Sequence, residues 1–205
     1  KDNGVFFHVD GCQAGCYLDL NVGKLGVDML SLNGSKIYGP KGVGMLYLKR
    51  GVHIEPLIHG GEQEMGKRAG TENVAGIVGF TKALEIAQSE MLEECNRLKE
   101  LRDFLIKGIL NKIPKTRLNG HVEKRLPNKV NVSFLDIEGE SILLYLDSKG
   151  IYASSGSACT SKTLDPSHVV LALGSPYEYA HGSIRFTLGR ETSKKDMEYV
   201  LKELC

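Results

Sequence analysis

The stretch Met29–Leu48 places the strongest constraint on the fold of this chain. Its sequence, MLSLNGSKIYGPKGVGMLYL, has apolar runs at both ends and a bend of small, polar and glycine residues between them. This pattern predicts a short buried strand over Met29–Leu32, a turn over Asn33–Ser35 and a second strand over Gly44–Leu48. We therefore expect two core strands that are joined by a shaped loop.

A single lysine, Lys36, lies at the start of this bend. A strand-edge position would partly desolvate its ammonium group, which lowers the pKa of a lysine and allows a Schiff base with an aldehyde such as pyridoxal phosphate. A solvated turn lysine is the alternative that position alone leaves open. The loop of Gly39, Pro40, Gly42 and Gly44 directly after Lys36 favours the chemical role.

An acidic residue upstream supplies a second candidate. The sequence VFFHVD predicts a buried strand over Val5–Val9 that ends at Asp10, and Gln13 follows in the next loop. Ligands of α/β proteins collect at the carboxyl ends of strands. An aspartate there can pair with a protonated pyridine nitrogen, which keeps a pyridoxal ring electron-poor. A helix N-cap is the structural alternative for Asp10.

Composition limits the class of protein. The chain has 205 residues, of which 41% are hydrophobic, and it carries 26 basic against 25 acidic side chains. This length supports one or two domains, and the balanced charge gives no electrostatic basis for nucleic-acid binding. No apolar run approaches the ~18 residues of a membrane span. Five cysteines without a disulfide framework indicate a reducing compartment, so we expect a cytoplasmic protein.

Two further motifs are poor matches to binding sites. His8, Cys12 and Cys16 are spaced by four residues, but a second cluster of zinc ligands is missing, so we expect no metal and two buried thiols. GEQEMGKR at 61–68 approaches the phosphate-loop pattern. Arg68 stands there in place of the serine or threonine that holds magnesium, which favours a polar loop.

The longest periodic signal predicts a helix that begins after Thr71, its expected N-cap, and bends near Gln88–Glu90. Its apolar stripe continues to Ile109, and we place a domain boundary near Ile113. The predicted domains are therefore 1–113 and 114–205. The expected elements of the second domain are a strand over KVNVSF, a helix over Glu138–Asp147, a strand over Gly150–Ala153 and a helix over Met197–Leu204.

The second domain contains two further candidate residues. Cys159 lies in ASSGSACTS, a stretch of small residues that predicts an accessible loop, and access is a condition for thiol reactivity. A helix N-terminus is the alternative for this stretch, and it would also lower the pKa of the thiol. Arg185 lies in a predicted strand between Ile184 and Phe186. An inward-facing arginine needs an anionic partner, for which a substrate carboxylate is suitable.

Taken together, these motifs resemble the pyridoxal-phosphate cysteine desulfurases of the class-V aminotransferase family, which supply sulfur for iron-sulfur clusters. The resemblance covers nearly the whole chain. The motifs that carry it are HVDGCQAG, GVDMLSLNGSKIYGPKGVG, EPLIHGGEQEMGKRAGTENVAGIVG, SSGSACTS and SIRFTLGR, which occur in the family's order. The implied fold class is α/β, the aspartate aminotransferase type (fold type I), with a large domain and a small C-terminal α+β domain.

The resemblance also implies roles for individual residues. Lys36 would be the Schiff-base lysine and Asp10 the partner of the pyridine nitrogen, while Gln13 would donate a hydrogen bond to the phenolic oxygen of the cofactor. Thr71 would reach the cofactor phosphate across a homodimer interface, and Cys159 would accept sulfur. The same comparison makes Arg185 the ligand of the substrate carboxylate. Asn33 and Ser35, where the family commonly has serine and histidine, would complete the cofactor-binding set.

The implied reaction removes sulfur from L-cysteine and leaves L-alanine and a persulfide on Cys159. The implied partners are a second copy of the chain and a sulfur acceptor or iron-sulfur scaffold protein. Two alternatives stay open, namely a lyase for selenocysteine or a cysteine derivative, and a non-catalytic truncated homologue. The family has a further N-terminal half, so the chain is expected to be the C-terminal half of such an enzyme.

Overall fold

The computed structural model describes residues 4–155 and 166–205, and the chain divides into two units, Lys1–Leu92 and Glu93–Cys205. The division falls inside the long helix α2 (Val74–Lys112) and not at its end. The sequence places the domain boundary near Ile113, and the assignment of domains 1–113 and 114–205 stays a prediction. Cys159 and most of the loop predicted around it lie outside the described residues.

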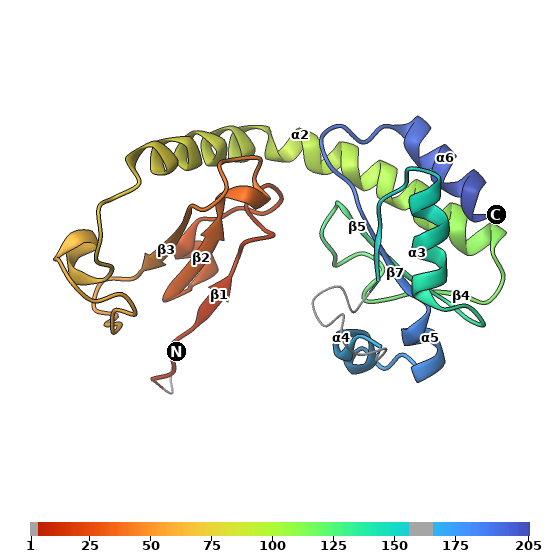
Figure 1. Cartoon of the computed structure of the whole chain (residues 1–205), viewed down its shortest axis with the longest axis horizontal. Helices are drawn as coiled ribbons and strands as arrows, with labels where there is room; N and C mark the ends of the chain where they lie inside the picture. Colours follow the sequence, from red (N-terminus) through yellow and green to blue (C-terminus); the bar gives the residue numbers. More distant parts are fainter. Residues whose placement is uncertain (1–3, 156–165) are drawn as a thin grey trace. The chain divides into compact units, whose positions relative to one another are not determined.

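The first unit is built on a three-stranded sheet (Figure 1). Its strands are β1 (His8–Asp10), β2 (Met29–Asn33) and β3 (Gly44–Leu48), in the spatial order β1-β2-β3. β1 runs parallel to β2 and places Asp10 beside Ser31. β2 runs antiparallel to β3 and places Asn33 beside Gly44. The strands predicted for the Met29–Leu48 stretch are therefore confirmed, and β2 extends one residue further than predicted.

Helical segments lie between and after these strands. α1 (Val22–Leu25) lies between β1 and β2, and the 3-10 turn η1 (Gly34–Lys36) lies between β2 and β3. The 3-10 turn η2 (Gln63–Gly66) and the first part of α2 follow β3. Asn21 starts α1, since its side chain accepts a hydrogen bond from the Lys24 amide at 3.0 Å. Gly26 ends α1 with a φ of 66°, a left-handed conformation that glycine adopts without strain.

The first strand is shorter than its apolar sequence predicts. Val5, Phe6 and Phe7 have no strand assignment and are 74%, 61% and 52% exposed, so the prediction of a buried strand from Val5 is wrong. The Phe7 amide donates to the Asp28 carboxylate at 3.0 Å, and Lys49 forms an ion pair with the same carboxylate. Strand character begins only at His8, because β2 provides its partners from Met29 onward.

Helix α2 is continuous over 39 residues. No break therefore occurs near Gln88–Glu90, and the bend expected there stays a prediction. Asn73, and not Thr71, caps its N-terminus, because the Asn73 side chain accepts a hydrogen bond from the Gly76 amide at 3.0 Å. Apolar side chains of the predicted stripe are buried along the helix. They include Phe80, Ala87, Leu98, Leu101, Leu105 and Ile109.

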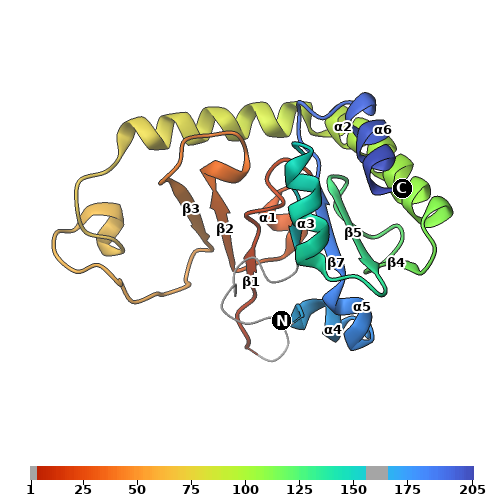
Figure 2. The same ribbon diagram turned by 45° about the vertical axis from the view of Figure 1, so that its right-hand side comes forward.

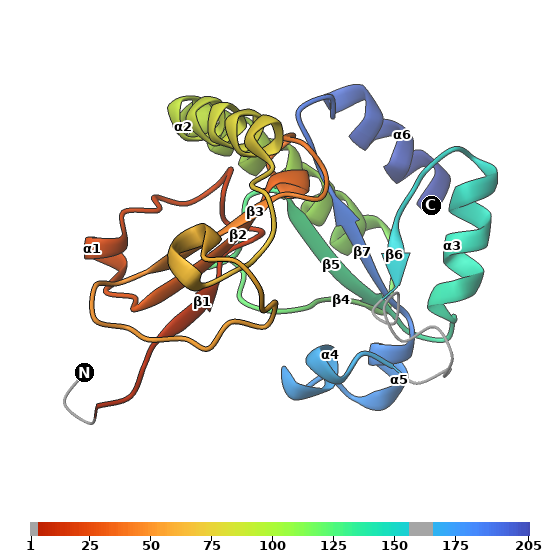
Figure 3. The same cartoon turned by 60° about the vertical axis from the view of Figure 1, so that its left-hand side comes forward.

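The second unit contains a four-stranded antiparallel sheet in the order β4-β5-β7-β6 (Figure 3). Its strands are β4 (Thr116–Leu118), β5 (Lys129–Phe134), β6 (Ser154–Ser155) and β7 (Ser183–Thr187). The prediction for KVNVSF is confirmed by β5. The predicted strand over Gly150–Ala153 is wrong, because pairing with β7 begins only at Ser154.

In the part of this unit that the structure describes, four helices accompany the sheet in addition to the second part of α2. They are α3 (Gly139–Ser148), α4 (His168–Ala172), α5 (Tyr177–His181) and α6 (Lys194–Leu204). The short helices α4 and α5 lie side by side (Figures 1 and 2). Helix α6 starts three residues earlier than predicted, since Ser193 and Asp196 form a reciprocal capping box. The core of the unit includes Val130, Val132, Leu146, Ile184 and Leu201.

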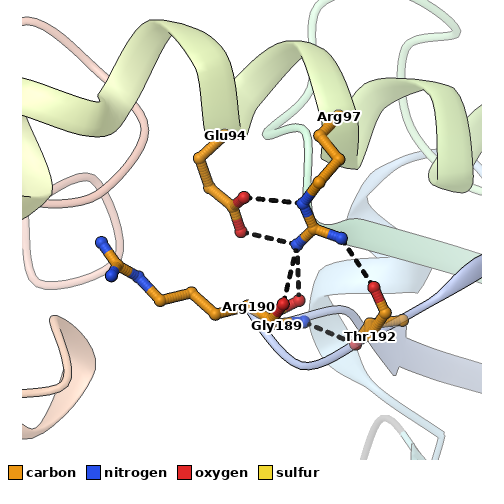
Figure 4. Close-up of polar contacts among 5 residues, drawn as sticks. All are labelled: Glu94, Arg97, Gly189, Arg190 and Thr192. Atoms are coloured by element: carbon orange, nitrogen blue, oxygen red, sulfur yellow. Dashed lines mark hydrogen bonds and ion pairs between the residues drawn. The ribbon is translucent and has the colours of Figure 1, made fainter.

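Arg97 of α2 binds the turn that follows β7 (Figure 4). Its Nε and Nη2 atoms each donate to the Glu94 carboxylate at 2.8 Å. Its Nη1 atom donates to the Thr192 carbonyl at 2.6 Å, and Nη2 also donates to the carbonyls of Gly189 and Arg190 at 3.0 and 3.2 Å. This Arg97 clamp fixes the turn that separates β7 from α6.

We expect Arg97→Ala to lower the free energy of unfolding by about 1.5–3 kcal/mol, because it removes charge-assisted bonds to partly buried acceptors. Urea unfolding followed by circular dichroism measures the change. Lys82→Ala is the matched control, since it breaks the Lys82–Glu85 pair, whose side chains are 70% and 61% exposed. That control should change stability by at most about 0.5 kcal/mol. Equal effects of the two substitutions would contradict a stabilising role for the Arg97 clamp.

Candidate functional site

The candidate site lies at the carboxyl ends of β1 and β2. Asp10 is the last residue of β1, Asn33 is the last of β2, and Lys36 ends the 3-10 turn η1 that follows directly. β1 and β2 are parallel, so their carboxyl ends lie at the same edge of the sheet. The topology therefore brings the predicted carboxylate and the predicted amine to one edge, which is where α/β proteins hold their ligands.

Asp10 is exposed and is held in its ionised form. Its Oδ1 accepts a hydrogen bond from the Cys12 amide at 3.0 Å. A hydrogen bond from the Cys12 side chain lowers the pKa of Asp10 below its ordinary value, and the Cys12 amide and the charge of His8 lower it further. Asp10 thus presents a negative charge at neutral pH, as the partner of a pyridinium nitrogen requires.

Cys12 lies next to the Asp10 carboxylate and against β2. Its half-buried thiol lies 3.9 Å from the Ser31 carbonyl oxygen. Burial raises the pKa of this thiol, and the Asp10 carboxylate raises it further, while the positive charge of Lys36 acts in the opposite direction. The Asp10 carboxylate therefore affects this thiol more strongly than Lys36 does. Spacing alone predicted Cys12 and Cys16 to be two buried thiols; Cys16 is buried, whereas Cys12 is only half-buried.

His8, the third residue of the spacing that suggested a metal site, contacts a serine. Its Nε2 atom lies 2.8 Å from Ser31 Oγ, so one of its ring nitrogens is hydrogen-bonded to a hydroxyl group. Within residues 4–155 and 166–205, no group of three histidine, cysteine, aspartate or glutamate side chains is arranged to hold a metal ion.

Lys36 is exposed, so the expectation of a partly dry environment is wrong for the described chain. The turn that presents it is closed by its own side chains. Asn33 Oδ1 accepts hydrogen bonds from the Ser35 amide at 2.8 Å and from Ser35 Oγ at 2.6 Å. Cys16 Sγ lies 3.8 Å from the Lys36 carbonyl oxygen. Asn33 and Ser35 therefore shape the turn, and their role toward a cofactor stays a prediction.

The loop after Lys36 lies against the first part of α2. A Cβ atom added at Gly39 would lie 3.0 Å from Ala83 Cβ, and one added at Gly79 would lie 2.7 Å from Pro40 Cγ. We call Gly79 and Ala83 the α2 notch, since these small residues let the loop approach the helix. Further along α2, Gln88 Nε2 donates to the Gly15 carbonyl at 2.8 Å.

Sequence reasoning assigned the notch residues and Gln88 only to a helix and missed their contact with the lysine loop. Gly79 and Ala83 are four residues apart, so they share one face of α2. This spacing of small residues was the available signal. Gln88 gave no signal of its contact, because a glutamine on the solvent face of a helix cannot be distinguished from it in the sequence.

The close packing of the turn at Gly34 leads to a prediction. A Cβ atom at Gly34 would lie 2.6 Å from the Pro40 carbonyl oxygen, which belongs to the backbone and cannot move without displacing the loop. We expect Gly34→Ala to lower the free energy of unfolding by about 1–3 kcal/mol, as overpacking does. Thermal unfolding measures this. Gly23→Ala is the control, because a Cβ there meets only the Asn21 side chain, and it should be neutral within about 0.5 kcal/mol.

The remaining predicted residues of the first unit lie in the segments after β1 and before α2. Gln13 is half-buried in the turn after β1, and Thr71 is exposed in the segment that precedes α2. Their roles toward the phenolic oxygen and the phosphate of a cofactor stay predictions.

Arg185 lies in the middle of β7, and its side chain is exposed. Its neighbours Ile184 and Phe186 are 0% and 4% exposed, so the strand alternates and turns Arg185 away from the core. The prediction of an inward arginine is therefore wrong. In the register of the sheet, Arg185 lies beside Ser154 of β6, which shortly precedes Cys159 in the sequence. Its role in binding a carboxylate stays a prediction.

Among the helices of the described residues, none combines the length and the apolar character of a bilayer-spanning segment.

A carboxylate and a lysine at the carboxyl ends of two parallel strands, followed by a separate antiparallel sheet, are the features of an α/β protein with a candidate site at one sheet edge. The chain belongs to the class-V aminotransferase family, whose model matches residues 1–200. This finding confirms the resemblance found in the motifs.

Curated relatives and solved structures agree with this assignment. The chain is 54% identical to "Cysteine desulfurase IscS" of Dictyoglomus turgidum over 204 residues, which cover 100% of this chain and 52% of the relative. It is 55% identical to the protein of the same name from Methanosarcina thermophila, over 98% of this chain and 50% of the relative. The chain thus spans about half the length of the curated relatives it matches.

Among solved structures, a "NIFS-LIKE PROTEIN" superposes on this chain with a TM-score of 0.88 at 37% sequence identity. The match covers 100% of this chain and 52% of the solved chain. A NifS-like protein from Rickettsia africae superposes with a TM-score of 0.87 at 30% identity, over 97% of this chain and 52% of its own. The fold class predicted from the sequence is therefore confirmed.

Proposed function

We propose that this chain is part of a cysteine desulfurase, which uses pyridoxal 5'-phosphate to remove sulfur from L-cysteine. The observation that carries the proposal is the placement of the ionised Asp10 and the amine of Lys36 at the carboxyl ends of two parallel strands, at one edge of the sheet. The names of the curated relatives support this activity. Because the chain spans about half of their length, the proposal concerns the complete protein.

The residues present fit the cofactor. The ionised Asp10 suits a protonated pyridine nitrogen, and the exposed Lys36 offers a primary amine to the aldehyde. Gln13, Asn33 and Ser35 supply neutral polar groups near the same edge. When bound, the cofactor supplies the electron sink for breaking the carbon–sulfur bond.

Each proposed catalytic or substrate-binding residue has a defined task in the reaction. Lys36 takes the proton from the Cα atom of the substrate, as a positioned general base. Arg185 binds the substrate carboxylate as a charge-assisted pair. The Cys159 thiolate attacks the sulfur of the substrate, so that an S–S bond forms while the carbon–sulfur bond breaks. Cysteine and a thiol thus become alanine and a persulfide, and no external oxidant or reductant is required.

The proposed partners follow from the same assignment. A second copy of the chain would form a homodimer in which Thr71 reaches the cofactor phosphate of the partner. The persulfide on Cys159 would pass to an acceptor protein, for iron-sulfur cluster assembly or another sulfur transfer. This chemistry belongs to a reducing environment, and we place the protein in the cytoplasm.

The test uses this chain produced together with the half of the Dictyoglomus turgidum relative that it does not span. After addition of pyridoxal phosphate and reduction with borohydride, mass spectrometry should find the cofactor mass on Lys36. In a separate sample that is not reduced, L-cysteine should be converted to alanine. Release of alanine only from selenocysteine would assign the protein to the alternative lyase class. A colourless protein without modified Lys36 would establish a non-catalytic homologue and overturn the proposal.

A further inference from the structure

A row of polar side chains crosses the second sheet on one of its faces. In the register of the sheet, Arg185 of β7 lies between Asn131 of β5 and Ser154 of β6 (Figure 3). Directly opposite residues of an antiparallel pair point to the same face of the sheet. The neighbours of Arg185 along β7, Ile184 and Phe186, are buried on the other face. Arg185 and Asn131 therefore share the polar face, with their Cβ atoms about 5 Å apart.

A buried hydrogen-bond network holds the Asn131 side chain. Asn119 is 6% exposed, and its Nδ2 atom donates to Asn131 Oδ1 at 2.6 Å and to Ser133 Oγ at 2.8 Å. The Asn119 Oδ1 atom accepts a hydrogen bond from Ser175 Oγ at 3.2 Å. Ser133 and Ser175 are buried as well. Because buried polar groups require their partners, this network fixes the direction of the Asn131 amide.

The same network leaves a hydrogen-bond donor next to Arg185. An asparagine amide offers two N–H donors on Nδ2 in addition to its carbonyl oxygen, and in Asn131 it is the oxygen that binds Asn119. Within residues 4–155 and 166–205, no group accepts a hydrogen bond from Asn131 Nδ2 or from the exposed Arg185 guanidinium. On the other side of Arg185, the Ser154 hydroxyl donates to the carbonyl of Ser155 at 3.2 Å. A charged donor and a neutral donor are therefore adjacent, and both lack an acceptor.

We propose that Asn131 is a second ligand of the substrate carboxylate, beside Arg185. The guanidinium supplies the charge-assisted bonds, and the Asn131 amide donates a further bond to a carboxylate oxygen. This inference rests on the proposed function, from which it takes the substrate and the role of Arg185. It defines the substrate more closely, as an amino acid with a free α-carboxylate, because an ester or amide in that place would carry no charge for Arg185 to bind.

The substitution Asn131→Asp separates this role from a purely structural one. A carboxylate at position 131 keeps an oxygen that can accept the hydrogen bond from Asn119, so the buried network stays closed. The same change removes the Nδ2 donor and places a negative charge beside Arg185, where it competes with the substrate carboxylate. A purely structural Asn131 would tolerate this change without any effect on substrate binding.

The test uses this chain produced together with the half of the Dictyoglomus turgidum relative that it does not span, loaded with pyridoxal phosphate. Asn131→Asp should raise KM for L-cysteine by at least about tenfold, as the loss of a hydrogen bond to a charged group does. Its kcat should stay unchanged, because the lost contact concerns binding of the substrate and not the reacting bonds. Its midpoint of urea unfolding should equal that of the unsubstituted protein.

Asn131→Ala is a second variant, which removes the amide without adding a charge, and it should raise KM in the same direction. Asn111→Asp is the matched control, since Asn111 is an exposed asparagine of α2 and its exchange adds the same charge. That control should leave KM unchanged.

The inference is overturned alone if the unsubstituted protein releases alanine from L-cysteine and both Asn131 variants keep its KM. Unfolding of both variants would assign Asn131 to the buried network only, and it would also overturn the inference. If the unsubstituted protein releases no alanine from L-cysteine, the proposed function fails and this inference fails with it.

Discussion

Lys36→Ala should abolish the covalent attachment of pyridoxal phosphate and lower alanine release from L-cysteine by at least about 10²–10⁴-fold, the range that proton transfer by a positioned base contributes. The physical reason is that no other amine lies in the 3-10 turn at the carboxyl end of β2. The measurement combines borohydride reduction and mass spectrometry with a kinetic assay of alanine on unreduced protein, in the chain produced together with the half of the Dictyoglomus turgidum relative that it does not span.

Lys41→Ala is the control for this experiment. Lys41 is an exposed lysine of the same loop, so its removal changes the net charge equally. It should retain both the attached cofactor and the activity within about twofold, as surface substitutions do. If Lys36→Ala kept the cofactor mass on another residue, the lysine-centred assignment of the site would have to be abandoned.

Cys159→Ala should eliminate the protein-bound persulfide while the cofactor stays attached to Lys36. The expected loss is complete, because the persulfide forms on the sulfur that the substitution removes. Incubation with L-cysteine, alkylation and peptide mass spectrometry would detect the persulfide, and visible absorbance would report the cofactor. This separation of two signals distinguishes loss of the nucleophile from loss of the fold.

Cys205→Ala serves as the comparison, since Cys205 is an exposed free thiol in the same unit. That variant should form the persulfide normally. Detection of the persulfide on Cys12 in the Cys159→Ala protein would reassign the nucleophile to the first unit.

Much of the local structure could be predicted because the sequence pattern and the burial pattern coincide. In β2, apolar side chains alternate toward the core, with Leu30 and Leu32 at 2% and 4% exposure. The same holds for the helical stripe through Leu98, Leu105 and Ile109, each of which is fully buried. Patterns of this kind depend only on the period of the element, which is fixed by backbone geometry.

The wrong predictions concern segments whose structure depends on contacts with other parts of the fold. Val5–Phe7 is as apolar as a core strand, but a strand needs a neighbour, and β2 supplies one only from Met29. Arg185 lies between two apolar residues, which suggested burial, whereas a strand alternates its faces and exposes the residue between two buried ones. Thr71 is a suitable N-cap residue, yet Asn73 is the one whose side chain reaches a free amide of α2.

The site itself was predictable only in part. Asp10 and Lys36 were identified by their place after predicted strands, and the parallel pairing of β1 and β2 explains why they share an edge. The half-buried position of Cys12 could not be predicted, because the Ser31 carbonyl that its thiol approaches belongs to the neighbouring strand. Such a contact between residues 19 positions apart in sequence has no local signal.

The α2 notch has a consequence for insertions and deletions. Gly79 and Ala83 pack against the loop that follows Lys36, and Gln88 on the same helix binds the backbone at Gly15. The rotation between these positions around the helix axis therefore determines whether both loops can be held. Each residue of an α-helix turns the next by about 100°. One residue added or removed between Ala83 and Gln88 would therefore rotate one anchor out of register with the other. This part of α2 should accept many exchanges of side chains and almost no change in length.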